Sequence, residues 1–372
     1  MAASSQRHDV IVVGARCAGS PTAMLLARRG YRVLLVDRVT FPSDTMRNHF
    51  IHGPGVGSLK RWGLLDRIVA SGCPAVRRQT FDLGDFPLSG PIEPVDGVDA
   101  NYGPRRYVLD TLLAHAAAEA GAELREGFSV QELVFENGEV VGIRGRSRTG
   151  GVVEERAPIV VGADGLHSLV ARSVQAPVYN TRPTLTCGYF SYFADIPVDG
   201  IAVAIVGNRF MIAFPTHGGL TCVAVQAPVA EFPSFRADIE RAFFASLDRV
   251  PWFAELVRPG RRVERWLGTA DLPNQYRKPY GPGWALVGDA GYHKDPLTAQ
   301  GITDAFRDAE LLTDAIDAGF TGRLSPAEAL AGYERRRNEA TRASYEEAVA
   351  MASFLPFPPE LYAHRAALRL AA

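Results

Sequence analysis

The sequence lacks the features that would tie the chain to a metal, a disulfide framework or a membrane. Its 372 residues include four cysteines, Cys17, Cys73, Cys187 and Cys222, and no two of them form a CxxC pair. This spacing excludes a redox-active dithiol and a zinc knuckle, so we predict no metal site and a reducing compartment. The apolar run behind the polar amino terminus is far shorter than the roughly 20 residues that cross a bilayer. We therefore expect a cytoplasmic protein with no membrane contact.

An excess of one charge is also absent. The chain has 40 Lys+Arg against 41 Asp+Glu, a formal net charge of −1. Without a basic field a protein does not hold a polyanion, which argues against nucleic acid as the main partner. The length and the 47% apolar side chains are enough for more than one core. We predict two domains around one cleft, with a small molecule as the substrate.

The amino-terminal segment has the pattern of a strand, a glycine turn, a helix and a second strand. Val10–Val13 predicts the first strand, Cys17–Arg29 the helix and Tyr31–Val36 the second strand. Because parallel strands need such a crossover, the pattern predicts the start of a doubly wound sheet. Short apolar runs at Ile159–Val161 and Trp284–Val287 predict later strands.

Between residues 181 and 266 the pattern changes to alternating aromatic and β-branched side chains. It predicts an antiparallel sheet with strands at Cys187–Phe193, Ile201–Val206, Phe210–Phe214 and Thr221–Ala227. The predicted fold is α/β, with a doubly wound cofactor-binding domain, an antiparallel-sheet substrate domain and a helical C-terminus. The boundaries are 1–75, 100–180 and 267–320 for the first domain, 76–99 and 181–266 for the second, and 321–372 for the helical segment.

Local signals place further elements along the chain. Amphipathic spacing predicts one helix at Val56–Val69, a second at Arg106–Ala120 and a single helix at Asp238–Leu247 within the substrate domain. Asn137-Gly138 between two apolar runs is the strongest short hairpin signal. The carboxyl-terminal helical pattern breaks at Pro356–Pro359.

The turn after the first predicted strand reads Gly14-Ala-Arg-Cys-Ala-Gly19, with Asp37 ending the second strand. In a GxGxxG dinucleotide fingerprint, backbone amides and the helix dipole face a pyrophosphate, and an acidic residue accepts from the ribose. Arg16 replaces the middle glycine, yet its guanidinium can itself meet a phosphate. Alone, the motif leaves a plain strand-to-helix turn as an alternative. For Cys17 we prefer a packing role.

Two later motifs stand at the ends of predicted strands, where ligands of doubly wound folds collect. They are Val161-Gly-Ala-Asp-Gly165 and Leu286-Val-Gly-Asp-Ala290, the second continued by Pro296 and Gln300-Gly-Ile302. With the fingerprint, this order and spacing resembles the FAD-dependent monooxygenases of the aromatic hydroxylase type. That superfamily also holds flavin-dependent halogenases and geranylgeranyl reductases.

The resemblance implies FAD as the cofactor and gives roles to single residues. Asp289 would bind the ribityl chain, and Pro296 and Gly301 would line the isoalloxazine. Arg106, with Arg105 as the alternative one residue away, would contact FAD phosphate or ribityl oxygens. The candidate cofactor-binding residues are Gly14, Ala15, Arg16, Cys17, Ala18, Gly19, Asp37, Arg38, Arg47, Arg106, Val130, Asp164, Gly165, Gly288, Asp289, Pro296, Gln300, Gly301 and Ile302.

Substrate and catalytic candidates come from the sheet domain and from two histidines. Alternate residues of a strand face one side, so Tyr192, Phe210 and Phe214 are candidates for an apolar slot, with core packing as the alternative. His49 and His293 are the candidate catalytic acid or base. The alternative for His293 is a hydrogen-bonded loop residue.

The resemblance implies a monooxygenase that hydroxylates an aromatic or polyketide-like molecule through a flavin C4a-hydroperoxide. O2 and NADPH or NADH would be co-reactants, and the need for a separate flavin reductase stays open. Alternatives are a flavin-dependent C=C reductase, a halogenase and a non-enzymatic flavin-binding or sensing protein. The tryptophan motif and active-site lysine of a tryptophan halogenase are not visible. The chain also departs from the usual GDAAH spelling, because Lys294-Asp295 precede the proline.

Overall fold

The computed structural model describes residues 8–45, 49–148 and 150–371. Its centre is a six-stranded sheet in the order β20-β21-β11-β1-β2-β7, in which all neighbours except β20 and β21 are parallel. The predicted doubly wound sheet is therefore confirmed. The strands are β1 (Val10–Val13), β2 (Val33–Val36), β7 (Glu123–Arg125), β11 (Ile159–Gly162), β20 (Tyr280–Gly281) and β21 (Trp284–Leu286).

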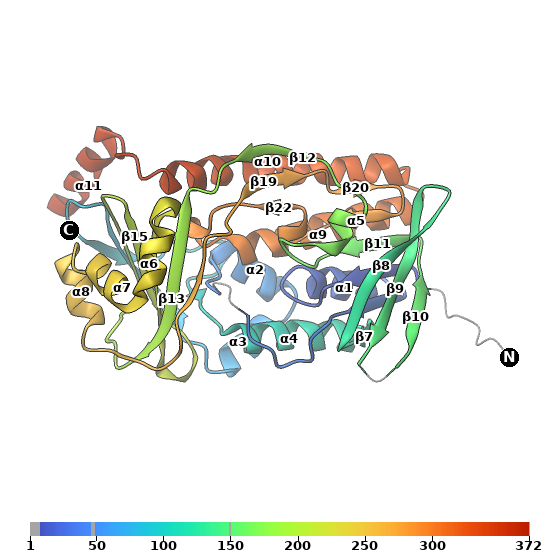
Figure 1. Cartoon of the computed structure of the whole chain (residues 1–372), viewed down its shortest axis with the longest axis horizontal. Coiled ribbons are helices and arrows are strands. Elements are labelled where there is room, and N and C mark those ends of the chain that lie inside the picture. The colour runs from blue at the N-terminus through green and yellow to red at the C-terminus, as the bar shows by residue number, and fades with distance from the viewer. Residues whose placement is uncertain (1–7, 46–48, 149, 372) are drawn as a thin grey trace.

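Both faces of this sheet are covered, which explains why its strands read as continuous apolar runs instead of alternating ones. Val10 and Val12 pack on one side with the helices, and Ile11 and Val13 pack on the other side with the β8–β9 hairpin. Figure 1 shows the helices α1, α2, α4 and α9 grouped in the middle of the molecule. Their bounds are α1 (Gly19–Arg28), α2 (Gly53–Arg61), α4 (Arg106–Glu119) and α9 (Gly301–Phe320), with the short α5 (Leu169–Ser173) near the hairpin.

The hairpin follows the sequence signal. β8 (Phe128–Glu136) and β9 (Glu139–Ser147) are joined by Asn137 and Gly138, whose φ angles are +50° and +84°. Two positive φ angles are what a type I′ turn requires, so the Asn-Gly prediction is confirmed. β10 (Val152–Arg156) adds the third strand.

The second large sheet has eight strands and contains the four strands predicted between residues 187 and 227. Its order is β17-β13-β16-β15-β14-β4-β5, with β18 on β13; β14 and β4 are parallel, and the other pairs are antiparallel. Because β18 belongs to it, this sheet extends beyond the boundary predicted at residue 266. The strands are β4 (Arg78–Asp82), β5 (Leu88–Pro91), β13 (Thr186–Ala194), β14 (Ile201–Val206), β15 (Arg209–Pro215), β16 (Thr221–Pro228), β17 (Arg261–Arg262) and β18 (Leu267–Thr269).

Three helices cover one face of this sheet, where the sequence predicts a single helix. They are α6 (Phe232–Ala237), α7 (Ile239–Leu247) and α8 (Pro251–Val257), which Figure 1 shows beside β13. The two extra helices start with proline at N1 or N2 and have six and seven residues. Helices of this length carry too little periodic signal to be recognised.

The predicted helix at Val56–Val69 is wrong in its extent. The segment forms α2 and a separate α3 (Leu65–Ala70), because Gly63 adopts a φ of +75° and ends the first helix. The predicted break near Pro356–Pro359 separates α10 (Pro326–Ala352) from α11 (Pro359–Ala371). Among the described residues, no helix is both long and apolar enough to cross a membrane.

The remaining elements are short and lie between the two large sheets or at turns. A three-stranded sheet contains β12 (Val178–Arg182), β19 (Asn274–Arg277) and β22 (Tyr292–His293), and β3 (Ala75–Val76) pairs with β6 (Asn101–Tyr102). The 3₁₀ turns are η1 (His217–Gly219), η2 (Val229–Glu231), η3 (Gly288–Ala290) and η4 (Pro296–Thr298).

Candidate functional site

The three motifs lie against one another at the carboxyl ends of β1, β11 and β21. A Cβ on Gly14 would lie 2.5 Å from the Ala163 carbonyl oxygen, and one on Gly288 would lie 2.7 Å from Ala18 Cβ. Both glycines also have positive φ angles, +103° and +62°. Only glycine allows this backbone and this closeness, so the turns form one cradle at the ligand-binding edge of the sheet.

Two helices begin at this cradle without a side-chain cap. Ala18 precedes α1 and Gln300 precedes α9, and neither side chain accepts a hydrogen bond from its helix. Gly301 is exposed, and a Cβ there would meet nothing within 4 Å. The first amides of a 20-residue helix can therefore be approached, and the partial positive charge of a helix amino terminus favours an anion there.

A buried ion cluster supports the fingerprint turn. Asp110 is fully buried in α4 and accepts from Arg106, with Nε–Oδ1 at 3.1 Å and Nη2–Oδ2 at 3.0 Å. Arg16 Nη1 lies 2.5 Å from Asp110 Oδ2, and Cys17 Sγ lies 3.3 Å from Oδ1. Burial raises the pKa of the Cys17 thiol, so the thiol stays protonated. This protonated, buried thiol agrees with the predicted packing role. Arg16 is thus held beside the turn by a carboxylate.

Two aspartates show how the cradle can accept a cofactor. Asp37 Oδ2 accepts from the Ala15 amide at 2.7 Å and so fixes the turn itself. Asp164 Oδ2 accepts from the Leu169 amide at 2.6 Å, whereas its buried Oδ1 has no hydrogen-bond partner among the described residues. Burial raises the pKa of Asp164. A buried acceptor without a donor costs about 1–3 kcal/mol, so Asp164 Oδ1 suits a hydroxyl or N–H of a ligand.

The other candidates of the second motif lie around the same edge. Asp289 is half-buried in η3. Burial lowers the pKa of Arg106, but the charge and the hydrogen bonds of Asp110 outweigh burial and raise that pKa overall, and the charge of Asp289 acts more weakly in the same direction. Pro296 begins η4, and Ile302 is buried in the first turn of α9.

The remaining cofactor candidates are more scattered. Arg38 is exposed beyond Asp37, and Gly165 has a φ of +80°. Val130 is half-buried on β8 and packs against the cluster under the hairpin. Arg47 lies outside the described residues.

Arg105 and Arg106 are neighbours in sequence but serve different surfaces. Arg106 binds Asp110 at the cradle, whereas the Arg105 guanidinium lies 3.7 Å from the centroid of the Tyr192 ring. Arg105 also binds Glu264 at 2.8 Å and Asp44 at 2.9 Å. It therefore contacts the eight-stranded sheet and does not replace Arg106 at the cradle.

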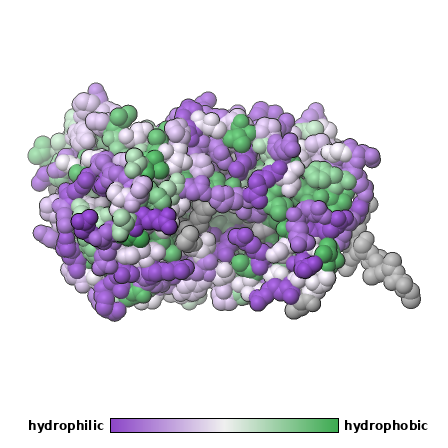
Figure 2. Space-filling model, in the orientation of Figure 1, coloured by the Kyte–Doolittle hydropathy of each residue, from purple (hydrophilic) through white to green (hydrophobic). Residues whose placement is uncertain are grey.

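The three substrate candidates share one face of the eight-stranded sheet. Tyr192, Phe210 and Phe214 are 2%, 3% and 0% exposed and belong to one apolar cluster with Phe50 and Leu297. We call His49, Phe50, Tyr192, Phe210 and Phe214 the aromatic wall. The residues that alternate with them along the strands, such as Tyr189, pack on the other face of the sheet, because successive side chains of a strand point to opposite faces. Figure 2 shows hydrophilic and hydrophobic residues interspersed over the visible face of the molecule, whereas the aromatic wall is buried.

His49 lies inside the aromatic wall. Its ring stacks on Tyr192 with centroids 5.6 Å apart, and its Nδ1 lies 3.0 Å from the Gly103 carbonyl oxygen. Since a carbonyl only accepts, Nδ1 carries the proton. Burial, helped by the charges of Arg105 and Arg106, lowers the pKa of His49 to about 3. A general base needs a pKa near the working pH, so this environment does not favour the predicted acid–base role.

His293 is held by the backbone. It lies in β22, and its Nδ1 is 2.5 Å from the Pro273 carbonyl oxygen. This contact matches the alternative of a hydrogen-bonded residue. His293 as a catalytic group stays a prediction.

The low pKa of His49 predicts a pH dependence of stability. The pKa is about 3 in the folded chain and about 6.5 when unfolded, so the unfolded chain binds the proton first as the pH falls. The free energy of unfolding should therefore fall between pH 6.5 and pH 3. From pH 7 to pH 5, His49 should account for a loss of about 2 kcal/mol. Denaturant titration of wild type and His49→Asn at both pH values measures it.

A matched substitution isolates this effect. His115→Asn changes an exposed histidine on α4 and should leave the pH dependence of wild type intact. An equal loss of stability in wild type and His49→Asn would contradict the low pKa.

Residues 7–348 match the family described as FAD binding domain. The chain belongs to this FAD-binding family. It is 28% identical over 352 residues to the digeranylgeranylglycerophospholipid reductase of Methanothrix thermoacetophila, covering 90% of this chain and 83% of that protein.

Solved structures show the same fold. The myxobacterial chondrochloren halogenase CndH superposes with a TM-score of 0.86 and 25% identity, covering 98% of this chain and 89% of that one. PqsL of Pseudomonas aeruginosa, described as a probable FAD-dependent monooxygenase, gives a TM-score of 0.79 at 20% identity, covering 94% and 97%. The family and these relatives make the protein an FAD-dependent oxidoreductase. Its cradle fits FAD, because the unpartnered Asp164 Oδ1 and the uncapped α1 and α9 offer complementary groups.

Sequence reasoning missed two residues that shape this site. Asp110 holds both Arg16 and Arg106, and the only signal for it is its i,i+4 spacing from Arg106 on a predicted helix. Glu264 holds Arg105 from a loop 159 residues away, and nothing local in the sequence indicates that pairing.

Proposed function

We propose that this FAD-dependent oxidoreductase is a monooxygenase that hydroxylates an aromatic or polyketide-like small molecule with O2. The observation that carries the proposal is the aromatic wall and its connection to the cofactor cradle. Leu297, which directly follows the flavin-lining candidate Pro296, belongs to the same apolar cluster as Tyr192, Phe210 and Phe214. A flat ring bound along this wall would lie next to the cofactor.

The chain's own residues would bind the cofactor, orient the substrate and exclude water. When bound, FAD supplies the redox chemistry with O2 that no side chain can perform. Arg16, Arg106 and the amino end of α1 suit its pyrophosphate, while Asp164 and Asp289 suit its hydroxyl or N–H groups. The buried aromatic wall keeps water from the reacting centre. Neutral His49 would orient a substrate and not take its proton.

We expect a purified, FAD-loaded protein to transfer one oxygen atom from isotopically labelled O2 to an aromatic substrate. NADPH and NADH are supplied in parallel, each with and without an added flavin reductase, so that the same assay identifies the reductant. Mass spectrometry of the product measures the transfer. A product that gains two hydrogens without O2 would contradict hydroxylation.

A C=C reductase is the second candidate, and one observation favours it. The match to the archaeal digeranylgeranylglycerophospholipid reductase extends over 90% of this chain at 28% identity. A buried apolar wall also suits an isoprenoid chain. Anaerobic turnover of a polyprenyl substrate with reduced FAD would support the reductase. Incorporation of chloride or bromide into the product in an aerobic assay with O2, reduced FAD and added halide would support a halogenase, the class to which CndH belongs.

A further inference from the structure

The dipeptide Lys294-Asp295 comes directly before Pro296 and has no role in the function described so far. Both side chains are buried. They lie between the cradle and the eight-stranded sheet, and each contacts a different part of the molecule. Two consecutive buried charges next to a cofactor loop are costly, which calls for a physical reason.

Asp295 connects the loop to the eight-stranded sheet. Its Oδ2 accepts from Thr186 Oγ1 of β13 at 2.6 Å, and its Oδ1 accepts from Gln226 Nε2 of β16 at 3.2 Å. Gln226 Nε2 also donates to Thr186 Oγ1 at 3.0 Å, so each of the three side chains is hydrogen-bonded to the other two. Oδ1 accepts in addition from the Leu297 amide at 3.3 Å, inside η4. One carboxylate therefore joins two strands of the sheet to the flavin-facing loop.

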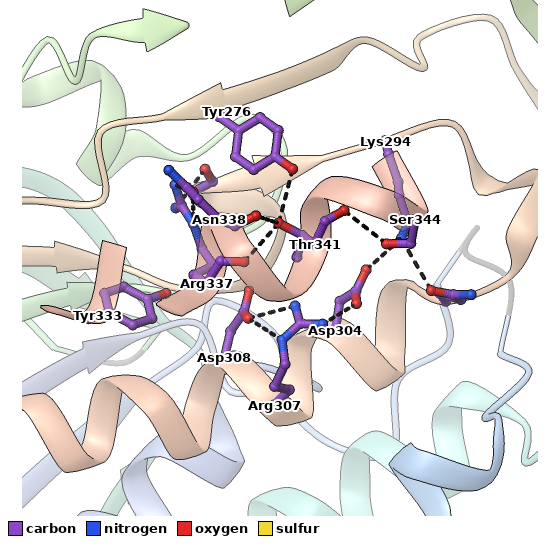
Figure 3. Close-up of polar contacts among 12 residues, drawn as sticks. Tyr276, Lys294, Asp304, Arg307, Asp308, Tyr333, Arg337, Asn338, Thr341 and Ser344 are labelled. Carbon is purple, nitrogen blue, oxygen red and sulfur yellow. Dashed lines mark hydrogen bonds and ion pairs between the residues drawn. The ribbon is translucent and has the colours of Figure 1, made fainter. Parts of the chain in front are cut away.

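Lys294 connects the same loop to the helices. Its Nζ lies 3.0 Å from Asp304 Oδ2 of α9 and 2.7 Å from Ser344 Oγ of α10. It also lies 3.4 Å from Gln300 Oε1, at the far end of the loop. Figure 3 shows Lys294 above this cluster, in which Arg307 links Asp304 to Asp308.

The buried position of Asp295 disfavours the charged form of its carboxylate. Burial raises its pKa to about 6, although the hydrogen bonds from Thr186, Leu297 and Gln226 act in the opposite direction. Its side-chain oxygens accept from the Thr186 hydroxyl, the Gln226 amide and the Leu297 backbone amide, and these hydrogen bonds stabilise the charged form. A hydrogen-bonded carboxylate fixes direction and distance more narrowly than an apolar contact does.

We propose that Asp295 is a positioning residue that couples the flavin-facing loop Pro296–Gln300 to the eight-stranded sheet, with Lys294 anchoring the loop to α9 and α10 from the opposite side. The loop then holds the flavin at a fixed distance from the aromatic wall. This inference rests on FAD binding by this family and not on which substrate is oxidised.

The test uses Thr186, which lies in the sheet and has no predicted contact with FAD. Thr186→Val keeps the volume but removes the hydroxyl, whereas Thr186→Ser keeps the hydroxyl. For the 372-residue chain we expect Thr186→Val to bind FAD about ten-fold more weakly and Thr186→Ser to stay within about two-fold of wild type. Flavin fluorescence measures the affinity. Visible-region circular dichroism of the bound flavin should change in the valine variant alone.

Three results would overturn the proposal. The first is a Thr186→Val protein with the FAD affinity and dichroism of wild type. The second is a serine variant as impaired as the valine variant, because packing and not the hydroxyl would then matter. The third is an equal change in Thr341→Val, which removes a buried hydroxyl of α10 that is hydrogen-bonded to Tyr276 of β19.

Gln226→Met carries the same test if Thr186→Val does not fold. It removes the amide donor to Asp295 at similar side-chain length, and the same change in flavin dichroism is expected. An unchanged dichroism would overturn the proposal. Because both readouts report on bound FAD, a failure to find a substrate leaves them unaffected, and the two failures can be distinguished.

Discussion

Replacing Asp110 by alanine is expected to lower the free energy of unfolding by about 3–5 kcal/mol. Asp110 is fully buried and is the shared carboxylate of Arg16 and Arg106. Its loss leaves two cations next to each other without their counter-charge, and Arg106 is itself buried. Breaking a buried pair by removing one partner is costly because the remaining charge cannot be solvated. Urea denaturation of the variant and wild type measures the difference.

The same substitution on the surface provides the control. Asp314 pairs with Arg29 at 2.5 Å, but both side chains are substantially exposed. An exposed pair contributes about 0–1 kcal/mol, so Asp314→Ala should change stability little. If Asp110→Ala cost no more than Asp314→Ala, the cluster would not be the support of the fingerprint turn that we describe.

FAD should moderate the effect of Asp110→Ala. A bound pyrophosphate offers negative charge to Arg16 and Arg106, which would replace part of the missing carboxylate. The loss of stability should therefore be smaller with saturating FAD than without it. A loss of the same size under both conditions would mean that the two arginines do not face the phosphates.

The elements that were predicted correctly are those whose signals are local. The β1–α1–β2 unit and the hairpin at Asn137-Gly138 follow from periodicity and turn chemistry within a few residues. The three-stranded sheet of β12, β19 and β22 was not predicted, because β12 pairs with β19 about 100 residues further along the chain and the three strands have only two to five residues. Pairing between strands so far apart in the sequence depends on the packed fold and produces no local hydrophobic periodicity.

The candidate site also combines features that local sequence signals predict with features that they do not. The three glycine-containing turns could be placed from sequence because each stands at the end of a strand, and their mutual contact follows from the fold. The direction in which a side chain points could not be predicted from the sequence. Arg105 and Arg106 are adjacent, yet one reaches Tyr192 and the other Asp110. The partners of Asp295 are likewise distant, with Thr186 109 residues away.

Gly19→Ala is expected to abolish FAD binding and to lower the free energy of unfolding by about 3 kcal/mol or more. A Cβ on Gly19 would lie 1.7 Å from the Gly14 carbonyl oxygen and 2.9 Å from Ala163 Cβ. The first contact is with backbone that cannot rotate away, so α1 must move off the turn. This motion displaces the amides that would face the pyrophosphate. Thermal unfolding and FAD titration by fluorescence measure both effects.

Gly332→Ala is the matched control because it makes the same change inside a helix with free space. A Cβ on Gly332 in α10 would meet only the Arg335 Nη2 atom, at 3.8 Å. Alanine favours a helix over glycine by about 1 kcal/mol, so this variant should be as stable as wild type or more stable. The two substitutions therefore have opposite expected signs. If Gly19→Ala retained wild-type FAD affinity, the close approach of α1 to the turn would not be what forms the cofactor cradle.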